Sequence, residues 1–250
     1  ELIARTEMEL DYRLEADNQR AFAKAYQGDP KFVVPHVVAS APKVVIQEWI
    51  DGIPLSHIIA DGTQEQRNLM ATRLFEFCDD APRRLEMVHG DAHPGNFMLM
   101  TGDRMGVIDF GAVAPMPGGW PIELGQMLRY AVDKNYEKLL PTMQNVGFIQ
   151  QGQQVSTEEI DDMLQQYVDP LQVPVFHYTR KWLQKMTTLE LDKAAGQIKA
   201  ARQMDIPPKL AIPMRVTASI VAISCQLDAH VPTQRIANEM VPGFADPDAV

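Results

Sequence analysis

The sequence contains little cysteine, and its charge is unbalanced toward acid. Only Cys78 and Cys225 occur among 250 residues, which excludes a framework of several disulfides and favours a reducing compartment. Lysine and arginine total 23 against 33 aspartates and glutamates, so the formal net charge is −10. Because neutralising nucleic-acid phosphates requires a basic face, we expect no nucleic-acid partner.

Long apolar runs and targeting signals are also missing. The best candidate for a membrane span, residues 210–225, is interrupted by Pro213 and Arg215 and is shorter than the ~20 apolar residues needed. No signal peptide opens the chain, so we expect a cytoplasmic protein, with contact to a membrane surface left open. Because the first residue is a glutamate in a helix-like stretch, we also expect a fragment of a longer protein.

Hydrophobic patterning predicts a small β element that precedes a mostly helical body, hence an α+β fold class. Four strands are expected, of which the first two and the last two form hairpins, at 32–38, 43–50, 97–100 and 105–108. Helices are expected at roughly 1–27, 64–86, 120–133, 135–146, 157–168, 175–204 and 208–227. The tail from residue 231 contains proline and is predicted to be irregular.

The segment with the most chemical information runs from His89 to Asn96, and Asp-Phe-Gly follows it at 109–111. It supplies a carboxylate at Asp91, an amide oxygen at Asn96 and, after two short strands, a second carboxylate at Asp109. Because a tight hairpin returns the chain beside its start, Asp109 is expected near Asn96 and Asp91. Asparagine and aspartate oxygens suit Mg²⁺, which leaves Asp91 to orient a hydroxyl or water and accept its proton. This spacing predicts a phosphoryl-transfer site with catalytic Asp91, Asn96 and Asp109 and metal ligands Asn96 and Asp109.

A transition-metal site is the competing interpretation of the same segment. His89, Asp91 and His93 alternate along an extended loop and could converge on zinc or iron. That site needs a further ligand nearby, and the magnesium interpretation accounts better for Asp109. The two histidines are then expected to brace the loop through hydrogen bonds to backbone or carboxylate groups.

The catalytic loop and the Asp-Phe-Gly motif resemble those of protein-kinase-like enzymes. The form His-Gly-Asp-x-His-Pro-Gly-Asn is shared by aminoglycoside and choline phosphotransferases and by the UbiB/AarF family of atypical kinases. Residues 9–18, 46–52 and 242–244 resemble the C-helix, the hinge strand and the C-terminal end of the UbiB/AarF family. Within that family, the motifs are similar to those of a bacterial macrolide-binding ATPase branch.

The resemblance implies a protein-kinase-like fold with a partial N-lobe over residues 1–50 and a helical C-lobe over residues 51–250. The C-lobe would carry the catalytic loop at 88–96 and the Asp-Phe-Gly motif at 109–111. The family's nucleotide loop, its strand lysine and its Lys-x-Gly-Gln extension are absent from the chain. Since all three would lie upstream of the C-helix, the fragment alone is expected to be inactive.

The resemblance also implies ATP and Mg²⁺ as cofactors and adds residues to the nucleotide site. Glu15 would pair with the missing strand lysine, and backbone groups of Glu48 and Ile50 would contact the adenine edge. Glu9 and Asp11 would form the family's Glu-x-Asp motif. Together with Asn96 and Asp109, these residues describe one half of a nucleotide site.

Three functions remain open at this point. The first is a kinase-like ATPase that hydrolyses or transfers the γ-phosphate and has an apolar ligand such as a quinone, a lipid or a macrolide. The second is a phosphotransferase for an aminoglycoside or amino alcohol, whose cationic substrate would suit the acidic cluster at Glu158, Glu159, Asp161 and Asp162. The third is a ligand-binding pseudokinase, although such a module has no need of a complete set of base and metal ligands.

Overall fold

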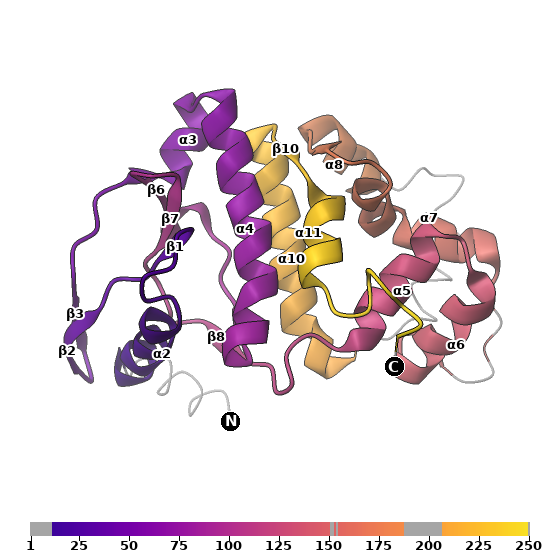
Figure 1. Cartoon of the computed structure of the whole chain (residues 1–250), viewed down its shortest axis with the longest axis horizontal. Coiled ribbons are helices and arrows are strands. Elements are labelled where there is room, and N and C mark those ends of the chain that lie inside the picture. The colour runs from indigo at the N-terminus through magenta and orange to yellow at the C-terminus, as the bar shows by residue number, and fades with distance from the viewer. Residues whose placement is uncertain (1–11, 151–152, 154, 188–206, 250) are drawn as a thin grey trace. The chain divides into compact units, whose positions relative to one another are not determined.

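The computed structural model describes residues 12–150, 153, 155–187 and 207–249, which form an α+β, mostly helical fold (Figure 1). This confirms the predicted fold class. The chain divides into two compact units: unit 1 comprises Glu1–Gly119 and Arg215–Ile223, and unit 2 comprises Trp120–Met214 and Ser224–Val250. The two units are defined by their compactness and do not test the expected boundary between an N-lobe and a C-lobe after residue 50, which stays a prediction.

The predicted helix over 64–86 is confirmed as α4 (Gln64–Leu85), the long helix of unit 1. Its first turn is closed by a capping box, in which the Thr63 hydroxyl accepts from the Gln66 amide and the Gln66 side chain accepts from the Thr63 amide. It ends at Glu86, which adopts a left-handed conformation with φ 52°. Unit 1 also contains α2 (Tyr12–Ala25) and α3 (Leu55–Asp61), and α3 was not expected from the sequence.

A four-stranded sheet of order β1-β7-β6-β4 lies in unit 1. Its strands are β1 (Phe32–Val33), β7 (Arg104–Val107), β6 (Phe97–Met100) and β4 (Ile53–Pro54). The β6–β7 hairpin confirms the prediction for the last two strands. Two further strands, β5 (Met87–His89) and β8 (Val113–Pro115), pair with each other; in the sequence, β5 precedes the predicted catalytic loop and β8 follows the Asp-Phe-Gly motif.

The first predicted hairpin is correct only in part. The run 32–38 is split, because β1 pairs parallel with β7 while β2 (Val37–Ala41) pairs antiparallel with β3 (Val44–Gln47). Pro35 lies at the break, where it has no N–H to donate to a ladder. Its carbonyl instead accepts from the buried side chain of Gln19 on α2, at 2.7 Å.

Helices dominate unit 2, and two of the predictions for it are wrong. The helix expected over 175–204 begins instead with β9 (Phe176–His177), followed by α8 (Arg180–Thr187); residues 188–206 lie outside the described ranges. The tail expected to be irregular contains α11 (Thr233–Met240), because Pro232 precedes its first turn and Ile236 and Ala237 are buried. Unit 2 also contains α5 (Ile122–Val132), α6 (Tyr136–Val146), α7 (Thr157–Val168), the short 3-10 helix η2 (Asp169–Leu171) and β10 (His230–Val231), which pairs with β9.

Helix α10 (Pro208–Leu227) confirms the last predicted helix and is rich in apolar residues. Within the described residues, its stretch Leu210–Leu227 is long and apolar enough to cross a membrane, with a mean hydropathy of 1.5. Core helices of soluble proteins meet the same criterion, and 44% of this stretch is buried in the structure. Length and composition therefore do not distinguish a core helix from a membrane helix here.

Asp79 on α4 is expected to make stability depend on pH. Burial, with the charge of Asp80 as a second cause, raises the pKa of Asp79 from its ordinary 3.8 to about 7. The contribution of Asp79 to the free energy of unfolding is therefore fully present below pH 3.8, where the carboxyl is protonated in both states, and is lost as the pH rises through about 7. Asp79→Asn should raise the free energy of unfolding by ~1–2 kcal/mol at pH 8, and much less at pH 4, in urea titrations.

The matched control for this prediction is Asp133→Asn. Asp133 is a partly exposed carboxylate that pairs with Arg129 at 2.8 Å, so its removal should give no gain at pH 8. Equal pH dependence of unfolding in the Asp79→Asn and parent chains would contradict the assignment.

Candidate active site

The β6–β7 hairpin brings Asn96 and Asp109 to the same end of the sheet. Phe97 is paired with Val107, so the residues before and after the hairpin leave side by side. The Ile108 amide continues this pairing by donating to the Asn96 carbonyl at 3.1 Å. The hairpin thus gives the proximity that the spacing predicted, and the roles of the two side chains remain predictions.

Asp91 and Asn96 are joined directly. The Asn96 Nδ2 donates to the Asp91 Oδ2 at 3.0 Å and to the Asp91 carbonyl at 3.1 Å. Asn96 is buried, whereas Asp91 is exposed. With Nδ2 committed to Asp91, the Oδ1 of Asn96 is the atom of this amide that suits a cation, and the Asp91 carboxylate is accessible to a reactant.

The two histidines brace the loop, as expected. The Nε2 of His89 bonds to the carbonyl of Asp109, and the Nδ1 of His93 accepts from the Gly95 amide at 3.1 Å. Burial is the main cause that lowers the pKa of His89, so this ring is neutral and donates from Nε2. Among the described residues, no group of three or more His, Cys, Asp or Glu is placed so that it could hold a metal ion.

Glu15 on α2 lies beside Asp109 and Gly111. A Cβ placed on Gly111 would lie 3.4 Å from the Asp109 Oδ1 and 3.8 Å from the Glu15 Oε2. Burial, followed by the negative charge of Asp109, raises the pKa of Glu15. The carboxyl groups of Glu15 and Asp109 thus repel each other when both are charged, and a cation bound beside them would reduce this repulsion.

Asn18 and Phe110 are site residues that the sequence analysis did not identify as such. The Nδ2 of Asn18 donates to the Phe110 carbonyl at 3.1 Å, and the Phe110 ring lies 5.0 Å from the ring of Phe22 on α2. The His89 ring also packs edge-on against Phe110, at 5.4 Å. Helix α2 therefore holds the Asp-Phe-Gly segment through both a hydrogen bond and an aromatic contact.

Glu48 and Ile50, the two residues expected to contact the adenine edge, make contacts with other segments of the chain. The Glu48 amide donates to the His36 carbonyl at 2.9 Å, so an adenine contact at this residue would use its carbonyl. The Ile50 side chain lies over β7, where a Cβ on Gly106 would come within 2.7 Å of its Cδ1. Glu9 and Asp11 lie outside the described residues.

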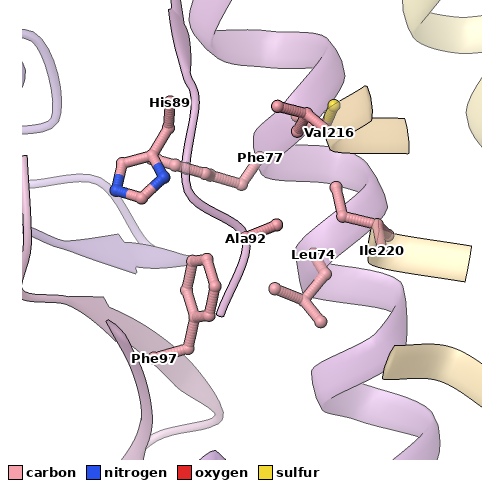
Figure 2. Close-up of a pocket in the computed structure, with 8 residues that line it drawn as sticks. Leu74, Phe77, His89, Ala92, Phe97, Val216 and Ile220 are labelled. Carbon is pink, nitrogen blue, oxygen red and sulfur yellow. The ribbon is translucent and has the colours of Figure 1, made fainter. Parts of the chain in front are cut away.

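A small apolar pocket lies behind the catalytic loop (Figure 2). Ala92 and His89 border it on the loop side, and side chains of α4 and α10 border it on the other. Its lining consists of Leu74, Phe77, Cys78, His89, Ala92, Phe97, Val216 and Ile220. Apart from His89, these side chains are apolar or weakly polar, so they support the loop by packing rather than by polar contacts.

Comparison with known proteins adds to this geometry. Residues 1–143 match the family model described as the ABC1 atypical kinase-like domain. The Arabidopsis thaliana protein named Protein ACTIVITY OF BC1 COMPLEX KINASE 1, chloroplastic, is 30% identical over 159 residues, which cover 59% of this chain and 22% of that protein. The Danio rerio protein named Atypical kinase COQ8B, mitochondrial, is 31% identical over 112 residues, which cover 44% of this chain and 18% of that protein.

One solved structure is similar over nearly the whole chain. It is described as the complex of Rv3197 with erythromycin from Mycobacterium tuberculosis, and it is 67% identical with a TM-score of 0.92. The match covers 98% of this chain and 61% of that one. This chain therefore spans about a fifth of the two curated relatives and about three fifths of the solved chain.

Proposed function

Because the chain belongs to the ABC1 atypical kinase-like family, we propose that it carries the catalytic half of an ATP-using site that acts on the γ-phosphate of Mg·ATP. The observation that carries the proposal is the joined set of Asp91, Asn96 and Asp109. Two hydrogen bonds from the Asn96 Nδ2 connect the first two residues, and the β6–β7 hairpin brings Asp109 beside Asn96. Asp91 is the catalytic base in this proposal, and Asn96 and Asp109 are the metal ligands.

The residues fit a magnesium ion by their donor atoms and by their charge. The Asn96 amide is oriented by Asp91, and the Asp109 Oδ1 is oriented by the Gly111 amide at 2.9 Å. Burial, and after it the negative charge of Asp109, raises the pKa of Glu15, and the nearby pair of carboxyl groups favours a cation at the same place. When bound, Mg²⁺ would neutralise charge on the β- and γ-phosphate oxygens.

The residues of the chain would divide the remaining work. The exposed Asp91 carboxylate would orient a water or a hydroxyl and accept its proton, while the Asn96 Nδ2 keeps that carboxylate in place. Glu15 would pair with a lysine from the strand that the family places upstream. The carbonyl of Glu48 and the amide of Ile50 would meet the adenine edge.

A macrolide is the apolar ligand that we propose for this protein. The support is the solved structure with 67% identity, which is described as an erythromycin complex. Neither a quinone nor a lipid has comparable support here. We propose that the protein is cytoplasmic and can bind to the surface of a membrane. The names of the two curated relatives describe those proteins as chloroplastic and mitochondrial.

The phosphotransferase alternative loses the feature that favoured it. Glu159 belongs to the capping box of α7 with Ser156, and Asp161 accepts from Tyr136 at 2.7 Å and from Lys134 at 3.3 Å. The acidic cluster is thus used in the local structure of unit 2.

The proposed function is tested by the release of γ-phosphate from Mg·ATP, with and without erythromycin. The protein should include the upstream sequence that its relatives have. Asp91→Asn is expected to lower turnover at least ~100-fold, because the amide cannot accept the proton. Asp133→Asn, an exposed carboxylate on unit 2, is the control and should match the parent chain.

The outcomes separate the open functions. Turnover that Asp91→Asn leaves unchanged would exclude Asp91 as the base. Binding of nucleotide without turnover in the parent chain would favour the pseudokinase instead. An effect of erythromycin on turnover, or direct binding of it, would support the macrolide as a ligand.

A further inference from the structure

Arg215 is the only charged residue between Leu210 and Leu227 of the apolar helix α10. It lies 125 residues from the catalytic loop in sequence, and the match to the family model ends at residue 143. In the structure, its guanidinium donates to the Gly90 carbonyl at 3.0 Å, and both residues belong to unit 1. We propose that Arg215 is a positioning residue for the catalytic base. This inference rests on the proposed function of Asp91.

The peptide that Arg215 holds is the one that leads into Asp91. The Gly90 amide donates to the Ala112 carbonyl at 2.7 Å, and the Gly90 carbonyl accepts from Arg215. Gly90 is therefore fixed on both sides, by the segment after Asp-Phe-Gly and by α10. Because Asp91 follows directly, the direction of its Cα–Cβ bond depends on this peptide.

Two apolar neighbours of Arg215 on α10 lie at the pocket that the catalytic loop also borders. Val216 and Ile220, one helical turn apart, line the apolar pocket together with Ala92 and Phe77 (Figure 2). Thr217 makes a side-chain hydrogen bond to Cys78 of α4. The helix thus shares an apolar pocket with the loop, and Arg215 adds the directional, charge-assisted bond that sets the loop's orientation.

Arg215 acts through the backbone and not on the reactants. Its bond is to a carbonyl, so its removal should leave the Asp91 carboxylate and the nucleotide contacts chemically intact. The expected defect is a catalytic base that samples more orientations. This predicts a lower kcat with little change in the KM for ATP.

The test compares Arg215→Met and Arg215→Lys with the parent chain by amide hydrogen exchange and by ATP turnover. Exchange in residues 88–97 should be faster in Arg215→Met and closer to the parent in Arg215→Lys, which keeps a positive donor. Where ATP turnover is measured, kcat should fall about tenfold in Arg215→Met while KM changes less than about twofold. Arg235→Met is the matched control, since that arginine lies 3.3 Å from Glu239 on α11.

Unchanged exchange in residues 88–97 of Arg215→Met would overturn the proposal. A lower melting temperature with kcat and loop exchange unchanged would also overturn it, because it would show a purely structural role. If the parent chain shows no turnover, the proposed function fails, while hydrogen exchange still decides whether Arg215 positions the loop.

Discussion

Replacing Asp109 with alanine is expected to abolish magnesium-dependent binding of ATP. Asp109 is the proposed principal metal ligand, and its Oδ1 is held by the Gly111 amide at 2.9 Å. Its removal also takes a negative charge away from beside Glu15, whose pKa is raised first by burial and then by that charge, so the site loses much of its attraction for a cation. Calorimetric titration of ATP with and without Mg²⁺ should show a loss of at least ~100-fold in the magnesium-dependent affinity.

The control for this prediction is Glu239→Ala on α11, which removes an exposed carboxylate paired with Arg235. It should bind Mg·ATP as the parent chain does. Magnesium-dependent affinity that survives in Asp109→Ala would show that the ion is held elsewhere. In that case the assignment of Asn96 as its partner would also have to be abandoned.

Gly125→Ala is expected to destabilise unit 2 by ~3 kcal/mol or more. Gly125 lies on α5 against the backbone of the C-terminal segment, where an added Cβ would clash with the Pro242 carbonyl and lie 2.8 Å from the Phe244 nitrogen. Both obstacles are backbone atoms, so no side chain can rotate away. Phe244 is completely buried, and the clash should expel its ring from the core. Urea unfolding would measure the loss.

The comparison for this prediction is Glu239→Ala again, since exposed positions usually change stability by less than ~0.5 kcal/mol. A Gly125→Ala chain as stable as that control would mean that the segment after residue 241 does not pack on α5. The Pro-Gly-Phe sequence at 242–244 would then have no structural role in unit 2.

Features set by neighbouring residues were predictable. The capping box of Thr63 and Gln66 begins α4, and the turn after Met100 closes the β6–β7 hairpin, so both elements lie where expected. The proximity of Asn96 and Asp109 follows from that hairpin alone. The braces made by His89 and His93 were also foreseen, because short polar loops commonly satisfy their backbone in this way.

Features that join distant parts of the chain were not predictable in the same way. The pairing of β1 with β7 takes Phe32 and Val33 out of the hairpin that the local pattern favoured, because Pro35 divides the run and Phe32 pairs with Met105. The helix α11 forms where proline predicted irregular structure, since the burial of Ile236 stabilises it.

The sequence by itself determined which chemical groups are present and, through one local hairpin, that Asn96 and Asp109 lie together. Only the tertiary structure decided what holds the backbone next to the candidate residues: Asn18 reaches the Phe110 carbonyl across 92 residues, and Arg215 reaches the Gly90 carbonyl across 125. The physical reason is range. A turn constrains its own neighbours through backbone geometry, whereas a hydrogen bond between distant segments exists only after packing has brought the two together.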